Sequence, residues 1–435
     1  MKQLFIMVMQ KFHKSILFFS LFFITKANLF CETLQIKFTE LQKLPSFNDF
    51  VNSTKDSPKQ INSFLSAAKP FGNKGQIFGS SFSALCDDLS YLNSNPSAAS
   101  LQNQTQAGGF LEYDLDSTFF GGLGITRRAK NISDFGYGLF GTLLTITDEK
   151  YFEVVTGLNL SYNFLSGYDF KGICAGINIK TGWQNLSFSS INNINQSDFV
   201  YFDSKSLFSI FFDLGLMTQF NLFKFFYSRE PNVKIGLSLK NLGIVFDETF
   251  GIPNNSPLPS EINLAFSCKF LKPITLCTGI SYPLNLYDFS QKYIPSVSFG
   301  FDFYFKEVIS LSLGTEFKKN KSQVSAGLEL TFSDKKININ YSLDYISKEF
   351  QNHKFSLSFK VLLGDNDRNL IDYMVDKYYQ AGLDYYANGE WEKSIKEWEK
   401  ALQLNKHFDP AVLCIESAQE QIKMFKKISE SLNFE

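Results

Sequence analysis

The chain has few of the residues that metal centres and catalytic triads use. It contains 3 histidines, none of them near another, and its 6 cysteines form no CxxC pair and no scaffold spacing. We interpret the cysteines as ordinary small residues and expect no metal site. No pair of residues has a catalytic pattern, so we expect no catalytic residue, no enzyme and no cofactor.

Net charge and long apolar runs are also lacking. The formal net charge is −1, which gives no indication of a nucleic-acid partner. The one marked apolar run, residues 16–24, is too short for a transmembrane helix, which needs about 20 apolar residues. Because small residues follow it at 25–27, we predict a secretory signal peptide over residues 1–27. Cys31 offers a lipidated start as an alternative, although the bulky Phe30 precedes it.

Phenylalanine is abundant, with 49 residues, and much of it alternates with polar residues. Successive side chains of a strand point to opposite faces, so each alternating segment has one apolar and one polar face. This period of two predicts fourteen strands, at residues 105–113, 117–127, 135–147, 151–165, 170–186, 207–222, 232–244, 260–271, 274–288, 295–306, 308–318, 321–333, 335–346 and 354–363. An even number of such strands with short connections is typical of an outer-membrane β-barrel. The alternative is a soluble β-sandwich or propeller.

The polar face of these strands carries charges of both signs. They are Lys234, Lys240, Glu261, Lys269, Asp302, Glu316, Glu329, Asp344 and Lys360. Mixed signs argue against an ion-selective ring and favour a salt-bridged inner wall packed against a plug.

A short motif precedes the first strand. Asn95 is a good helix cap and Pro96 a good first helical residue, so a short helix can begin there. The spacing of Ala84, Asp87, Asp88, Asn95 and Pro96 resembles the N-terminal region of FadL/TodX-type long-chain fatty acid transporters and of related PorV/PorQ-type outer-membrane proteins. The three residues after Pro96 depart from the usual Ala-Gly-Leu of that family. The resemblance implies a plug inside the barrel, in which the two aspartates would be buried polar groups that need partners.

From residue 364 the apolar period changes from two to 3.6, which indicates helices. The segment resembles one tetratricopeptide repeat with a capping helix, on the spacing of Tyr378, Ala381, Gly382, Tyr385, Ser394, Trp398 and Ala401. These residues would pack two helices together. Because fewer than three repeats are marginally stable alone, we expect the module to dock on the barrel, on a protein partner or on itself.

The sequence therefore predicts an all-β transmembrane barrel of about 14 antiparallel strands with an N-terminal plug and a small all-α appendage. The expected parts are a signal peptide (1–27), an irregular segment (28–74), a plug-like segment (75–104), the barrel (105–363) and periplasmic helices (364–435). An even strand number places both ends of the barrel on the periplasmic side of the outer membrane of a diderm bacterium.

Three functions agree with this architecture. The first is FadL-like uptake of long-chain fatty acids or other hydrophobic compounds, with outer-membrane lipid around the barrel. The second is a non-transporting PorV-like scaffold whose periplasmic repeat binds a protein partner. The third is a structural or adhesive barrel.

Overall fold

The computed structural model describes residues 64–114, 118–129, 134–146, 151–165, 171–186, 205–226, 231–247, 253–254, 258–286, 293–305, 308–318, 321–345, 351–365 and 367–432. The expected signal peptide, Cys31 and the segment up to residue 63 lie outside these residues. Among the described residues, no helix has the length and apolar character needed to cross a membrane.

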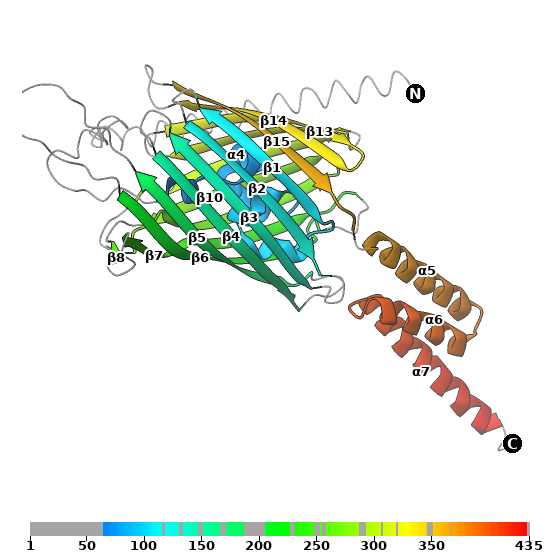
Figure 1. Ribbon diagram of the computed structural model, residues 1–435. Helices are drawn as coiled ribbons and strands as arrows, with labels where there is room; N and C mark the ends of the chain where they lie inside the picture. Colours follow the sequence, from blue (N-terminus) through cyan, green and yellow to red (C-terminus); the bar gives the residue numbers. More distant parts are fainter. Residues whose placement is uncertain are drawn as a thin grey trace, which may run out of the picture. The chain divides into compact units, whose positions relative to one another are not determined.

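Fourteen antiparallel strands of the described chain form a closed barrel (Figure 1). They are β1 (Gln106–Asp114), β2 (Thr118–Arg128), β3 (Phe135–Ile146), β4 (Tyr151–Phe164), β5 (Ile173–Leu186), β6 (Lys205–Phe220), β7 (Val233–Asp247), β9 (Ser260–Leu271), β10 (Ile274–Leu284), β11 (Ser296–Phe305), β12 (Ile309–Lys318), β13 (Lys321–Phe332), β14 (Lys335–Tyr345) and β15 (Gln351–Leu362). The sheet closes because β1 pairs with β15 and β6 pairs with β7. A further strand of two residues, β8 (Pro253–Asn254), pairs with the end of β7. The prediction of a fourteen-stranded antiparallel barrel is confirmed.

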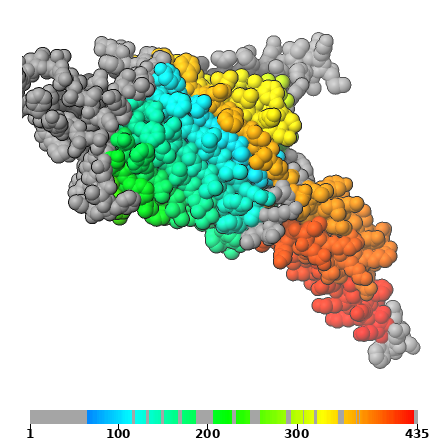
Figure 2. Space-filling view, in the orientation of Figure 1, coloured from blue at the N-terminus to red at the C-terminus, as the bar shows by residue number. Residues whose placement is uncertain are grey.

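The two faces of the strands differ as the alternation predicts. Leu328 is 40% exposed on the outer face, whereas its neighbour Glu329 is 1% exposed and points into the barrel. On the side seen in Figure 2, the described residues of β1–β5 form a continuous outer surface. Closure pairs the backbone groups of every strand, which an edge exposed to lipid would leave unsatisfied.

The lumen contains an interior segment, residues 64–102, most of which is buried. It consists of α3 (Leu65–Ala68), α4 (Gly72–Phe78) and the short 3₁₀ helices η2 (Gly79–Ala84), η3 (Leu89–Asn93) and η4 (Pro96–Leu101). Figure 1 shows α4 behind the front strands of the barrel. Among the described residues the segment includes residues 64–74, whereas we expected the plug-like segment from residue 75. The sequence there has no sustained period, and its burial comes from contacts with distant strands.

Three helices follow the last strand: α5 (Arg368–Ala387), α6 (Trp391–Leu404) and α7 (Asp409–Leu432). Of the seven positions on which a repeat was predicted, Ser394, Trp398 and Ala401 are buried, and Gly382 lies against the indole of Trp398. Tyr378, Ala381 and Tyr385 are half-buried. Gly389, with φ +76°, makes the turn between α5 and α6.

Candidate functional site in the barrel lumen

Glycines on the inner face of the strands let the interior segment pack closely against the barrel wall. A Cβ on Gly279 would lie 2.5 Å from the backbone nitrogen of Ser81, and Cβ atoms on Gly136, Gly176 and Gly314 would also overlap with backbone atoms of the segment. These glycines therefore let two backbones approach closely. We did not predict this role from the sequence, although a glycine inside a strand is a known signal of such an approach.

A buried ionic network ties the segment to β11, β13 and β15. The Lys74 ammonium lies 3.1 Å from Asp302 and 3.9 Å from Glu329. The Lys360 ammonium lies 2.5 Å from Asp88 and 3.4 Å from Glu329. Burial alone would raise the pKa of the Asp88 carboxyl, but the neighbouring Lys360 ammonium holds that pKa below its ordinary value. The carboxylate therefore stays charged at neutral pH.

The five residues of the sequence motif hold the segment together and to the wall. Tyr304 donates to the Asp87 carboxylate at 3.0 Å, and Asp88 also accepts from the Ser90 amide at the start of η3. Asn95 caps η4 and donates to the carbonyl oxygens of Ser83 and Leu216 at 2.8 and 3.1 Å. Pro96 begins η4, and the Ala84 carbonyl accepts from Ser267 on β9. These contacts stabilise the segment inside the barrel.

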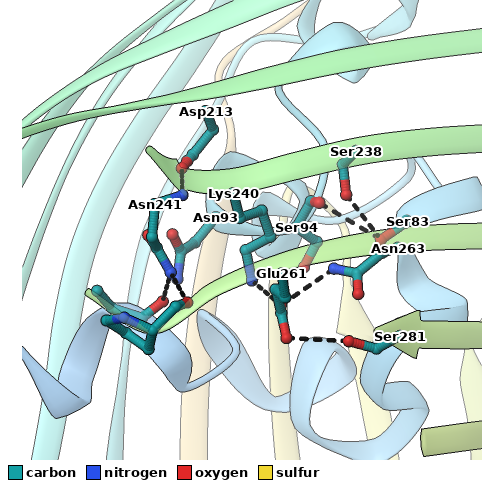
Figure 3. A network of polar contacts seen from close by, with 12 residues as sticks. Ser83, Asn93, Ser94, Asp213, Ser238, Lys240, Asn241, Glu261, Asn263 and Ser281 are labelled. Carbon is teal, nitrogen blue, oxygen red and sulfur yellow. Dashed lines mark hydrogen bonds and ion pairs between the residues drawn. The ribbon is translucent and has the colours of Figure 1, made fainter. Parts of the chain in front are cut away.

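We did not predict a second buried polar network from the sequence. Lys180 and Asp213 are fully buried, 2.7 Å apart, on β5 and β6. The amide of Asn241, which has φ +57°, donates to Asp213, and its side chain donates to the Ala67 and Pro259 carbonyls (Figure 3). The available signal was the position of Lys180 and Asp213 on the polar faces of two expected strands.

A cavity of about 40 Å³ lies between the interior segment and strands β7, β9, β10 and β12. Its wall includes Lys240, which lies 2.8 Å from Glu261, and Glu261 also accepts from Asn263 and Ser281 (Figure 3). Such a polar space holds a few water molecules and not a lipid chain.

The opposite part of the lumen is apolar. Buried apolar side chains line the inner face of β1–β4 and β6 in two clusters, which we together call the apolar strip. One cluster contains Phe110, Phe120, Phe140 and Leu144, and the other contains Val155 and Phe211. The ring of Phe71 covers it at 4.9 Å from the ring of Phe110 and 5.9 Å from that of Phe140. Phe64 lies 6.0 Å from Phe211. The covering residues 64–71 thus bury an aromatic wall inside the barrel.

A few polar contacts hold the covering residues in place. The amides of Phe64 and Ser66 donate to Gln184 and Glu153 at 3.0 and 2.9 Å. The Lys69 ammonium lies 2.9 Å from the Glu112 carboxylate. We did not single out Glu112 or Glu153 from the sequence.

Together these features define an outer-membrane-type β-barrel with a filled lumen, a fold that fits a location in an outer membrane. The chain belongs to an uncharacterised protein family, UPF0164, whose model matches residues 48–366. One relative, a UPF0164 protein of Treponema pallidum (strain Nichols), is 25% identical over 392 residues, covering 84% of this chain and 85% of the relative. A second from the same organism is 24% identical and covers 82% of this chain and 75% of the relative.

Among solved structures, the chain is similar to the toluene transporter TbuX of Ralstonia pickettii, with a TM-score of 0.49 and 11% identity over 69% of this chain and 100% of that one. It is also similar to the monoaromatic hydrocarbon channel CymD, with a TM-score of 0.47 and 12% identity over 69% and 99% of the two chains.

Proposed function

We propose that this protein is an outer-membrane barrel that takes up hydrophobic compounds, such as long-chain fatty acids, with the interior segment as its plug. The observation that carries the proposal is the apolar strip, which residues 64–71 cover with Phe64 and Phe71. An aromatic wall inside a lumen otherwise lined by polar groups supplies the apolar surface that a hydrophobic molecule needs.

Uptake requires residues 64–71 to leave the strip while the rest of the plug stays seated. The ligand then replaces the rings of Phe64 and Phe71, so the apolar area buried in the lumen changes little. The proposal includes no catalytic step, and it keeps the plug and the C-terminal helices on the periplasmic side.

The test compares two faces of one strand. We expect the purified protein to retain hydrophobic compounds that mass spectrometry detects after solvent extraction, and cells that produce it to take up a radiolabelled hydrophobic compound faster than cells without it. Phe140→Asn should lower both the amount of retained compound and the rate of uptake, because it puts a polar amide group into the apolar strip. Leu139→Asn, at a side chain 55% exposed on the outer face, is the matched control. A protein without retained compounds, and uptake equal to that of cells without it, would contradict the proposal.

The second candidate function is a non-transporting scaffold that binds a periplasmic protein through α5–α7, acting as a tetratricopeptide repeat. The supporting observation is a group of exposed apolar side chains on α7, with Leu413, Phe425 and Ile428 each more than half exposed. Deletion of residues 364–435 separates the two candidates. Uptake above that of cells without the protein, persisting after the deletion, supports the transporter. No uptake above that of cells without the protein, together with a co-purifying protein that is lost on deletion, supports the scaffold.

A further inference from the structure

Lys69 occupies a site with the chemistry of an ammonium receptor. Its Nζ lies 2.9 Å from Oε1 of Glu112 and 5.1 Å from the centre of the Phe120 ring. Glu112 is 4% exposed and Phe120 is fully buried. A buried carboxylate beside an aromatic face is the arrangement that recognises ammonium groups, because ion pairing and the ring quadrupole act on the same charge.

The wall around Glu112 is rich in carboxylates. Asp114 lies two residues further along β1, and Asp344 faces the same region from β14. Lys354 on β15 pairs with Asp344 at 2.6 Å and also interacts with Glu112 and Asp114. The departure of Lys69 with the covering residues takes the ammonium group away from Glu112 and Phe120, so the site favours a cation in its place.

The ammonium site is continuous with the apolar strip. The ring of Phe120 lies 5.0 Å from that of Phe110, which contacts Phe71. Lys69 and Phe71, two residues apart, thus place an ammonium group on Glu112 and an aromatic group on the strip. They mimic one molecule with a charged head and an apolar tail.

We propose that Glu112 and Phe120 bind the ammonium head of a hydrophobic amine, whose tail lies along the apolar strip once residues 64–71 have moved away. This inference rests on the proposed uptake of hydrophobic compounds, and it replaces long-chain fatty acids, the example given there, by amphiphilic cations, because Glu112 would repel a carboxylate head. Lys69 is the internal competitor for the head, so its removal strengthens binding of the amine.

The test uses three water-soluble probes that share one tail: 4-phenylbutylamine, 4-phenylbutan-1-ol and 4-phenylbutyrate. Binding to the full chain in a non-ionic maltoside detergent is measured by equilibrium dialysis against empty micelles. We expect Lys69→Met to tighten amine binding about tenfold relative to the alcohol, since it frees the carboxylate. Glu112→Gln should abolish the preference for the amine and leave the affinity for the alcohol within about twofold.

Glu316→Gln is the matched control, because it neutralises a lumen carboxylate next to the polar cavity and away from the strip. Circular dichroism and heat-modifiability confirm that each variant is folded. Equal binding of the three probes, or an amine preference that persists in Glu112→Gln, would overturn the ammonium site and leave uptake through the strip standing. Failure of all three probes to bind folded wild-type protein and folded Lys69→Met would overturn the proposed function itself.

Discussion

Replacing Gly279 by alanine tests how closely the interior segment is seated. An added Cβ would lie 2.5 Å from the backbone nitrogen of Ser81, 2.6 Å from its Cα and 2.7 Å from the carbonyl carbon of Ser80. Real Cβ atoms essentially never come closer than 3.0 Å to such atoms, so this backbone must move by about half an ångström. The shift strains the 2.8 Å hydrogen bond from the Ser81 amide to Ser298. We expect a loss of about 1–3 kcal/mol in the free energy of unfolding, the usual effect of overpacking.

Gly141→Ala is the matched control on the outer face of β3. Its added Cβ would meet its nearest neighbours at 3.8 and 3.9 Å, which is ordinary contact. Heat-modifiability on gels and urea titration of the reconstituted protein measure the stability of both variants. Gly279→Ala should unfold at a lower temperature and urea concentration than Gly141→Ala, and its interior segment should be cut faster by protease. The same midpoints and cleavage rates for both variants would refute the close seating.

Three further changes test the outer face, the ionic network and the helices. Leu328→Arg should impair membrane assembly, because a charge at the bilayer midplane costs about 2–4 kcal/mol, whereas the inward Ser358→Ala should assemble normally. Equal yields of folded barrel for the two variants would mean that the faces are assigned wrongly. Asp88→Asn should lower the free energy of unfolding, measured by urea titration, by about 1.5–3 kcal/mol. Adding Lys360→Met to the same chain should restore part of the lost free energy, and strictly additive losses would show that the two side chains are not coupled. Gly382→Val should make α5–α7 of the full-length protein more sensitive to protease, because a larger side chain overlaps with the indole on α6, and equal cleavage rates would contradict that packing.

The strands could be predicted because the barrel has two different environments across each one. Leu328 faces outward and Glu329 faces the lumen, and this alternation along each strand gives the sequence its period of two. The predicted ends of the strands were less accurate than the strands themselves where polar residues continue the alternation. The expected strand at 274–288 ends at Leu284, and the one at 354–363 begins at Gln351.

The lumen contacts could not be predicted in the same way. Lys74 pairs with Asp302, which lies more than two hundred residues later in the sequence, and no periodic pattern predicts that pair. The motif around Asp88 and Asn95 was recognised from a resemblance, but the partners of these residues came only from the structure. Lys69 and Glu112 carried no signal beyond their charge.

The two sides of the lumen differ in the contacts that hold the interior segment in place. On the polar side, displacement would separate buried pairs such as Lys74 and Asp302, and the loss of one partner of a buried pair costs about 3–5 kcal/mol. On the apolar side, residues 64–71 are held by the ion pair of Lys69 with Glu112 and by ring contacts. They also make hydrogen bonds with Glu153, Gln184 and Asn241. A ligand with an apolar tail supplies the same ring contacts, and an ammonium head supplies the same ion pair with Glu112. Exchange of residues 64–71 for such a ligand keeps the Glu112 carboxylate paired, so these residues, and not the whole interior segment, are the part that the proposed uptake has to move.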